Sequence, residues 1–234
     1  MTDKRRVVVT GAAGRIGEAV CAALADRWDL VPVDIKAAEG VARLDVTDDA
    51  ACRQTFAGAD AVVHLAADPD PEADWDSLLP ANVVAPYQVA SAAVACGVRR
   101  LVLASSLHAV SAEPRVRQRR ATDQPRPANL YGATKAWVEA LGASIAATSS
   151  TTVVALRIGY FSEDRPPADE WERSAWLSAR DAADLVRAAV EATDVDGFLV
   201  VNGISANRFQ VADLTEARAL GYRPADDAWA SPDR

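Results

Sequence analysis

The sequence has few of the residues that bind metals or form disulfides. Among its 234 residues there are only 2 histidines and 3 cysteines. Neither His64 nor His108 has a second ligand at a spacing typical of zinc, so we expect no metal site. The cysteines Cys21, Cys52 and Cys96 are odd in number and widely spaced, which argues against a disulfide framework. We expect them to be ordinary packing residues.

Positive charge and long N-terminal apolar runs are also scarce. The 25 basic and 33 acidic residues give a net charge of -8, which disfavours nucleic acid as a partner. The densest basic run contains Arg115, Arg117, Arg119 and Arg120, and it is predicted to be a solvated loop. The first apolar run, at 6–10, is too short for a signal peptide or a membrane span. We therefore expect a cytoplasmic location and no membrane partner.

Short β-branched runs alternate with Ala- and Leu-rich segments of helical period. The predicted strands are 6–10, 29–34, 41–44, 61–66, 100–105, 152–158 and 197–201, and the predicted helices are 15–26, 48–56, 76–97, 129–147 and 179–192. The strands are apolar on both faces, as parallel strands between two helix layers must be. The fold class is therefore predicted as α/β, a Rossmann-type doubly wound parallel sheet. We expect one domain over 1–234, with a small C-terminal substrate-binding portion at 197–234.

Two long loops, 107–128 and 159–177, interrupt this alternation. Both follow the carboxyl ends of strands, where open α/β sheets bind their ligands, so we expect substrate contacts there. After the second loop, Ser178 and Asp181 predict a capping box at the start of the last long helix.

A glycine-rich turn joins the first strand to the first helix. Gly11, Gly14 and Gly17 form a G-x-x-G-x-x-G pattern, in which glycine allows a tight turn and a close approach of backbone N–H groups to a pyrophosphate. With a strand before it and a helix after it, this pattern predicts a dinucleotide-binding site.

Further residues at strand ends support this site. Asp34 ends the second strand, where a carboxylate accepts hydrogen bonds from ribose hydroxyls and repels a 2′-phosphate, which favours NAD over NADP. Asp34 as a merely solvated residue is the alternative, and nearby Lys36 would soften the discrimination. Two roles are open for Asp45, a helix cap or an acceptor for the adenine amino group. His64 is predicted to be a hydrogen-bonded core histidine.

Tyr131 and Lys135 are spaced i, i+4 at the start of a predicted helix and so share one face. An unperturbed phenol titrates near pH ~10, so a neighbouring ammonium is expected to lower the tyrosine pKa toward neutrality. This pair predicts a general acid/base that exchanges a proton with an alcohol.

Taken together, the motifs resemble the extended short-chain dehydrogenase/reductase family, the NAD-dependent epimerase/dehydratase group. They are T-G-A-A-G-R-I-G at 10–17, L-D-V-T at 44–47, H-L-A-A at 64–67, L-A-S-S at 103–106 and Y-G-A-T-K at 131–135. The resemblance implies that Ser106 orients the reacting hydroxyl, Tyr131 is the general acid/base, and Lys135 tunes Tyr131 and holds the nicotinamide ribose. The cofactor contacts that it implies are Gly11, Gly14, Arg15, Ile16, Gly17, Asp34, Asp45, Val46, Leu65, Ala66, Ala67, Asn82, Ser105, Tyr131, Lys135 and Ile158.

Within that family the chain resembles the uronate dehydrogenases, which oxidise the cyclic hemiacetal of a hexuronate to a lactone. The implied substrate contacts are Ser106, Leu107, His108, Gly159 and Arg173. Leu107 replaces a polar asparagine of those enzymes. Their carboxylate-clamping arginine would fall close to Trp171, with Arg173 displaced by two positions. His108 has two open roles, a substrate contact or a packing residue of the loop.

Several alternatives remain at this stage. A sugar epimerase or a sugar-phosphate dehydrogenase would share the same three catalytic residues, whereas a non-catalytic dinucleotide-binding regulator often loses the tyrosine. Dehydration is disfavoured because Leu107 and His108 supply no acidic pair. The short segment after Lys135 favours a small substrate. Related proteins pair through the helices equivalent to 76–97 and 129–147, which predicts a homodimer; packing of the same apolar faces on the sheet is the alternative.

Overall fold

The computed structural model describes residues 4–113, 117–163 and 166–230. A seven-stranded sheet has the order β3-β2-β1-β4-β5-β6-β9, and all of its strand pairs are parallel. Its strands are β1 (Arg6–Thr10), β2 (Asp29–Asp34), β3 (Ala42–Arg43), β4 (Ala61–His64), β5 (Arg100–Ser106), β6 (Thr152–Ile158) and β9 (Phe198–Gly203). The predicted doubly wound sheet is confirmed.

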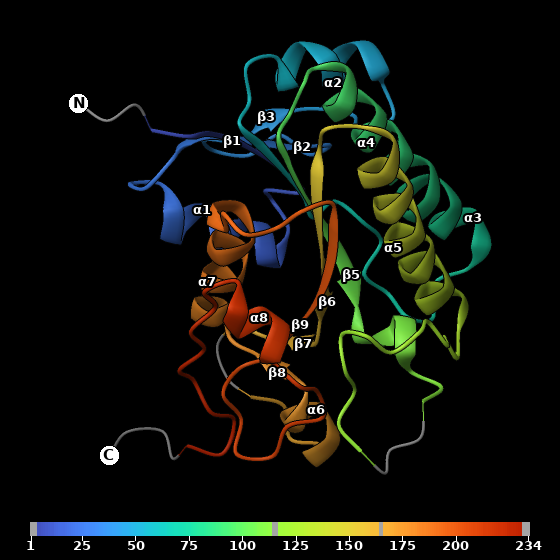
Figure 1. Ribbon diagram of the computed structural model, residues 1–234, viewed down its shortest axis with the longest axis vertical. Coiled ribbons are helices and arrows are strands. Elements are labelled where there is room, and N and C mark those ends of the chain that lie inside the picture. Colours follow the sequence, from blue (N-terminus) through green and yellow to red (C-terminus); the bar gives the residue numbers. More distant parts are fainter. Residues whose placement is uncertain (1–3, 114–116, 164–165, 231–234) are drawn as a thin grey trace.

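Helices cover both faces of the sheet (Figure 1). One layer contains α1 (Arg15–Leu24) and α7 (Ala179–Glu191), and the other contains α2 (Asp49–Phe56), α4 (Ala85–Ala95) and α5 (Leu130–Thr148). Successive residues of a strand point into opposite layers: Val7 and Val9 belong to the core beside α1 and α7, and Val8 to the core beside α4. Two apolar cores therefore hold the sheet from both sides.

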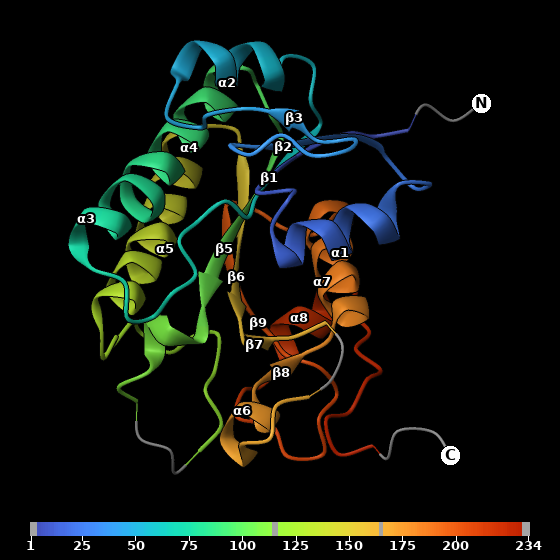
Figure 2. The ribbon, with the colours of Figure 1, turned by 180° about the vertical axis from the view of Figure 1, so that it is seen from behind.

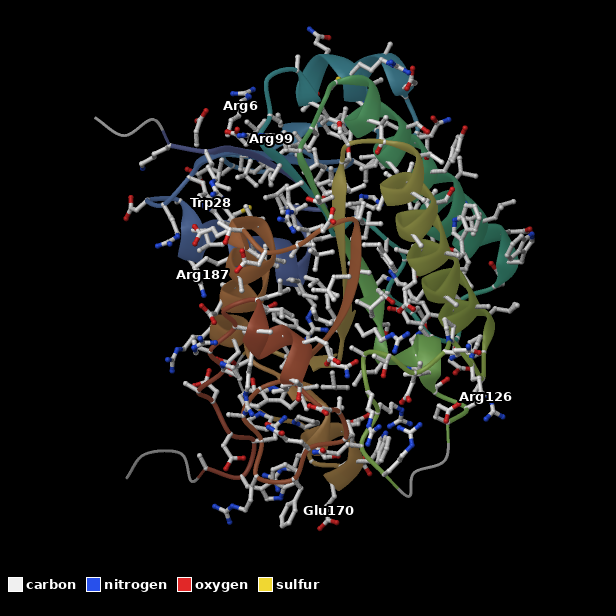
Figure 3. The ribbon with its side chains drawn as sticks, viewed as in Figure 1. Arg6, Trp28, Arg99, Arg126, Glu170 and Arg187 are labelled. Atoms are coloured by element: carbon white, nitrogen blue, oxygen red, sulfur yellow. The ribbon has the colours of Figure 1, made fainter. Side chains whose placement is uncertain are left out.

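Strand order reverses between β1 and β4, which places a crevice beyond their carboxyl ends. A small second sheet lies at this carboxyl end of the main sheet (Figure 2). It consists of β7 (Tyr160–Phe161) and β8 (Trp176–Leu177), and it is accompanied by α6 (Glu170–Ser174) and α8 (Thr215–Ala219). Figure 3 shows Arg126 and Glu170 at this end of the molecule and Arg6 and Arg99 at the opposite end. The loops predicted to contact substrate are thus gathered at one end of the sheet.

The helix predicted at 76–97 is not a regular α-helix. It consists of α3 (Trp75–Leu78), a π-helical segment η1 (Leu79–Val84) and α4. By length and composition alone, the stretch Trp75–Ala95 is apolar enough to cross a membrane. Core helices pass the same test, and the inner face of α4, including Val89 and Ala93, is buried in the core. We therefore interpret this stretch as a core helix.

Other predictions needed smaller corrections. Helix α1 ends at Leu24 and β4 at His64, earlier than predicted, and the two loops contain a 3-10 turn, η2 (Leu107–Val110), as well as β7, α6 and β8. Ser178 caps α7 by accepting from the N–H of Asp181, as predicted. The return bond of a capping box is missing, because the Asp181 carboxylate accepts from the N–H groups of Ala225 and Asp226. Asp181 therefore holds the C-terminal segment against α7.

Candidate active site

The glycine turn after β1 is held so tightly that only glycine fits. Gly11 has φ +73°, and a Cβ there would lie 2.5 Å from the backbone nitrogen of Ala66. A Cβ on Gly17 would lie 2.7 Å from Cα of Ala12. Gly14 is the N-cap of α1, so the free N–H groups of the first helical turn face the crevice. This cradle of backbone donors fits the pyrophosphate of a dinucleotide.

Arg15 connects the glycine turn to the other side of the crevice. Its Nη2 donates to the carbonyl oxygen of Phe161 at 2.9 Å, and its guanidinium lies over the Phe161 ring at 5.5 Å. The Nε is 3.7 Å from a carboxylate oxygen of Glu163. Neighbouring Ile16 packs against the core beside α1. The turn and β7 are therefore braced against each other.

Asp34 organises the same turn from the end of β2. One carboxylate oxygen accepts from the N–H of Ala13 at 3.1 Å and the other from the N–H of Lys36 at 3.0 Å. Asp34 therefore does more than end a strand in solvent. Its negative charge stands beside the glycine turn, where the sequence predicts the adenosine ribose.

Asp45 does not cap the following helix, contrary to one of its two expected roles. Its carboxylate accepts from the N–H and hydroxyl of Thr47, at 2.9 and 2.7 Å, and so closes the turn after β3. The N-cap of α2 is Asp48, which accepts from the N–H of Ala51. Val46 packs against the core beside α2. Asp45 is exposed and lies on the β3 side of the crevice.

Ser106, Tyr131 and Lys135 come together as predicted. The α5 N-cap Asn129 accepts from the N–H of Gly132, which starts the helix just before its active face. Ser106 lies close enough to Tyr131 for its hydroxyl to lower the pKa of the phenol. The Lys135 Nζ lies 5.4 Å from the centre of the Tyr131 ring and donates to the carbonyl oxygen of Ala104 at 3.1 Å. Helix α5 thus presents a phenol and an ammonium to the end of β5.

The expected lowering of the tyrosine pKa is not found in this structure. Burial raises the pKa of Tyr131 above its usual value, the hydrogen bond from Ser106 opposes this, and the Asp68 carboxylate raises it further. Burial also lowers the pKa of Lys135 to about 8, while Asp68 raises it. The phenol is therefore protonated at neutral pH, and Lys135 is close to its titration point. The prediction was wrong because the sequence does not reveal how deeply both groups are buried.

Asn82 supports the site from the π-helical segment. Its Oδ1 accepts from the N–H of Asp68 at 2.8 Å, and its Nδ2 donates to the carbonyl oxygen of Asp68 at 3.0 Å and to the Thr134 hydroxyl at 3.3 Å. One buried amide thus fixes the loop after β4, which includes Leu65, Ala66 and Ala67, against α5. π-helical segments often occur where a side chain must be aimed at a functional site.

The motif residues described above fall within the match to one protein family. The model of the NAD dependent epimerase/dehydratase family matches residues 7–162, which include the glycine turn and the three catalytic candidates. The chain is a member of the NAD dependent epimerase/dehydratase family. The resemblance inferred from the motifs is confirmed.

Relatives in this family include sugar dehydrogenases. An L-arabinose 1-dehydrogenase (NAD(P)(+)) from Haloferax volcanii is 40% identical, over 95% of this chain and 97% of the relative. An NAD-dependent glucose-6-phosphate dehydrogenase from the same organism is 39% identical, over 95% of this chain and 94% of the relative. The crystal structure of a uronate dehydrogenase variant from Agrobacterium tumefaciens complexed with NAD has a TM-score of 0.86 at 29% identity, covering 96% of this chain and 86% of that one. These findings confirm the predicted fold and NAD as the cofactor.

On the substrate side of this family member, the structure brings only some of the predicted residues to Tyr131. The His108 ring meets the Tyr131 ring edge-on at 5.3 Å, and the His108 N–H donates to Ser106 Oγ at 3.1 Å. Leu107 instead lies in the core beside α7. Gly159, after Ile158 at the end of β6, allows a close approach of the Ala175 backbone. The Arg173 guanidinium lies over the Trp229 ring at 5.7 Å, toward the C-terminal segment.

Arg119 corrects the prediction that its basic run is a solvated loop. Arg117 and Arg120 are exposed, and Arg115 lies outside the described residues, but Arg119 is only 4% exposed. Its Nε donates to the carbonyl oxygen of Val110 at 3.3 Å, and its guanidinium lies over the Trp171 ring at 4.9 Å. Its charge also lowers the pKa of His108, after the larger effect of burial. A cation therefore stands close to the catalytic residues. Sequence periodicity within a loop gives no signal for it.

His64 is a buried core histidine, as predicted. Its Nδ1 lies 2.8 Å from the Thr10 hydroxyl at the end of β1. Burial, with a smaller effect of the Lys135 charge, lowers the pKa of His64 to about 3. Because the unfolded chain binds a proton near the ordinary histidine value and the folded chain does not, stability falls as the pH drops through this window.

We expect acidification from pH 6.5 to pH 5 to destabilise the protein through His64 by about 1.6 kcal/mol. Urea unfolding of the protein and of His64→Asn at both pH values measures this effect. Other groups contribute equally to both proteins, so the variant is expected to lose correspondingly less stability. Equal losses in the two proteins would contradict a neutral, buried His64.

Proposed function

We propose that the chain is an NAD-dependent dehydrogenase that oxidises the hemiacetal hydroxyl of a small sugar or sugar acid. The observation that carries this proposal is that Ser106, Tyr131 and Lys135 come together beside a glycine turn that fits a dinucleotide, with the Lys135 Nζ 5.4 Å from the centre of the phenol ring. The similarity to dehydrogenases of arabinose, glucose 6-phosphate and uronate supports it.

The chain's own residues have separate tasks in this reaction. Ser106 holds the oxygen of the substrate hydroxyl. Tyr131 takes the hydroxyl proton from its phenolate form, after its own proton has been lost to solvent. NAD, when bound, supplies the acceptor for the hydride that leaves the same carbon. Lys135, anchored on Ala104, holds a positive charge beside the phenol and so favours the state in which Tyr131 has lost its proton.

A substrate screen tests this function. Neutral aldoses, aldose phosphates and hexuronates are each incubated with NAD, and NADH absorbance is followed. We expect NADH in stoichiometric amount with at least one class. Interconversion of sugar isomers without net NADH would instead favour the epimerase alternative. If neither reaction is detected, the non-catalytic dinucleotide-binding regulator is favoured.

The site favours an anionic sugar over a neutral one. Arg119 is a buried cation whose charge is close enough to lower the pKa of His108, and the His108 ring contacts that of Tyr131. A guanidinium is suited to bind a carboxylate or a phosphate in a defined orientation. We expect Arg119→Met to lower kcat/KM about 10- to 100-fold for an anionic sugar, the effect of losing one charged hydrogen bond.

Neutral and anionic sugars are compared in the same assay. We expect a smaller loss for a neutral aldose with Arg119→Met, and little change for either sugar with Arg120→Met, which removes the same charge one residue further on at an exposed position. An equal loss on both sugars would assign Arg119 a purely structural role.

We also propose a homodimer that pairs through the outer faces of α3, η1, α4 and α5. Most of the large exposed apolar side chains lie there: Trp75, Leu79, Val84, Tyr87, Leu130 and Trp137. Contiguous patches of this kind often mark interfaces. Light scattering of Tyr87→Glu tests the proposal, with Phe209→Glu, at an exposed apolar residue elsewhere, as the control. A dimer that persists in Tyr87→Glu, or a monomeric parent protein, would contradict it.

A cytoplasmic location is proposed as well. Its support is that Cys21, Cys52 and Cys96 are all free thiols, as is usual in a reducing compartment. Cell fractionation with an antibody against the protein tests the location, and recovery in the membrane fraction or the medium would contradict it.

A further inference from the structure

Arg157 and Glu139 form a fully buried ion pair between β6 and α5. The Nε of Arg157 lies 2.7 Å from one carboxylate oxygen of Glu139, and its Nη2 lies 2.8 Å from the other. The Arg157 side chain is 1% exposed and that of Glu139 is 5% exposed. Ser105 donates its hydroxyl to the same carboxylate at 2.7 Å. The hydroxyl of Ser105, a residue that the sequence predicts beside the cofactor, is thus engaged by Glu139.

The pair acts on the same helix face that carries the catalytic residues. Glu139 follows Lys135 by four residues and Tyr131 by eight, so all three side chains lie along one side of α5. Ser105 immediately precedes Ser106 on β5. The carboxylate of Glu139 is therefore bonded both to the strand that carries Ser106 and to the strand that carries Arg157.

The same guanidinium also holds the loop on the substrate side. Arg157 Nη1 donates to the carbonyl oxygen of Arg120 at 3.2 Å, and Nη2 donates to that of Asp123 at 2.9 Å. From the next strand, Asn202 donates to the carbonyl oxygen of Arg119 at 3.1 Å. Asn202 is paired in register with Arg157. Two neighbouring polar side chains at the sheet edge thus fix segment 119–123 of the loop.

A buried ion pair is a poor source of stability, because desolvation of both charges offsets most of their attraction. Its contribution is instead a fixed geometry. A guanidinium donates its hydrogen bonds within a rigid plane, and here these bonds join α5 to the loop segment 119–123. We propose that Arg157 and Glu139 are positioning residues that hold the substrate loop at a fixed distance from Tyr131. The proposal rests on the proposed dehydrogenase function and assigns the pair to substrate orientation, not to NAD binding.

The test uses the double variant Arg157→Met/Glu139→Leu. A single replacement leaves one buried charge unpaired and is expected to lower the melting temperature strongly, whereas apolar replacement of both restores much of the stability. We expect kcat/KM for the sugar to stay about 10- to 100-fold below that of the parent protein even in this stable double variant. Small misplacements of reacting groups produce effects of this size. The KM for NAD is expected to stay within about twofold, because the glycine turn lies across the sheet.

The matched control is Arg27→Met/Glu191→Leu, which removes a two-point ion pair between the α1 end and α7, outside the site. It is expected to leave both kinetic constants unchanged. A double variant at Arg157 and Glu139 with normal kcat/KM for the sugar would overturn the proposal, as would a loss that simply follows the melting temperature in both pairs.

A second measurement separates this proposal from the proposed function. This measurement is amide hydrogen exchange, which needs no substrate. It is followed in segment 119–123 and at Arg126, whose backbone N–H donates to the carbonyl oxygen of Ala109. We expect faster exchange there in the double variant than in the control variant. Unchanged exchange would overturn the positioning role even if sugar oxidation is found. Faster exchange in a protein that oxidises no sugar would instead refute the function and retain the anchoring of the loop.

Discussion

Replacement of Tyr131 with phenylalanine is expected to lower kcat for sugar oxidation by about 10³-fold while NAD still binds. General acid/base catalysis contributes on the order of 10² to 10⁴ to a rate, and the substitution removes only the hydroxyl that exchanges the proton. The ring that packs against His108 and Lys135 is retained. The measurement is the initial rate of NADH formation at saturating sugar, with an NAD titration followed by protein fluorescence.

Tyr87→Phe provides the control for this variant. It removes a hydroxyl from a half-exposed tyrosine on α4 and is expected to leave kcat unchanged. Retention of more than about a tenth of the parent kcat by Tyr131→Phe would conflict with the expected range for a general base. Another group would then have to accept the proton, and the proposed mechanism would fail.

The second large effect is expected at the glycine turn. In Gly11→Ala, the new methyl group meets the backbone of Leu65 and Ala66, with distances of 2.5 to 2.8 Å to backbone atoms. Backbone cannot yield as a flexible side chain does, so the turn must move away from the loop after β4. The N–H groups that face the pyrophosphate then lose their arrangement, and we expect NAD affinity to fall at least about 100-fold, which corresponds to about 2.7 kcal/mol.

Gly58→Ala is the control that separates the effect of the Cβ clash at Gly11 from the effect of backbone strain. Gly58 has φ +71°, close to the +73° of Gly11, but a Cβ there meets nothing within 4 Å. Both variants therefore carry the same conformational cost, roughly 1 to 2 kcal/mol of stability, and only Gly11→Ala adds the clash. Calorimetric titration with NAD is expected to find normal affinity in Gly58→Ala. Similar affinities in the two variants would argue against the cradle at Gly11.

The fold and the centre of the site were accessible from the sequence because both depend on local patterns. Apolar runs with helical segments between them specify a parallel sheet, and the spacing of the glycines and of Tyr131 and Lys135 is set within a single turn or helix. Asn129 also starts α5 close to the predicted boundary. These features need no knowledge of distant parts of the chain.

The remaining features depend on contacts between distant segments. The ion pair of Arg157 and Glu139 joins residues on different elements, and nothing near either residue in the sequence announces its partner. The sequence gives no sign of the influence of Asp68 on Tyr131 and Lys135, because this influence arises only when the loop after β4 is folded against α5. The charged neighbours of Arg119 predict an exposed side chain, whereas Trp171, far along the chain, covers its guanidinium.

The π-helical segment Leu79–Val84 has an implication for how this chain tolerates insertions and deletions. A wider helical turn accommodates one more residue than an α-helix of the same length, and one residue rotates an α-helix by about 100°. Deletion of a single residue here would give a more regular backbone ladder but would swing the amide of Asn82 away from Asp68 and Thr134. The extra residue of the π-helical segment therefore sets the direction in which Asn82 points from the helix. A homologue without that residue would need a different side chain to anchor the loop after β4.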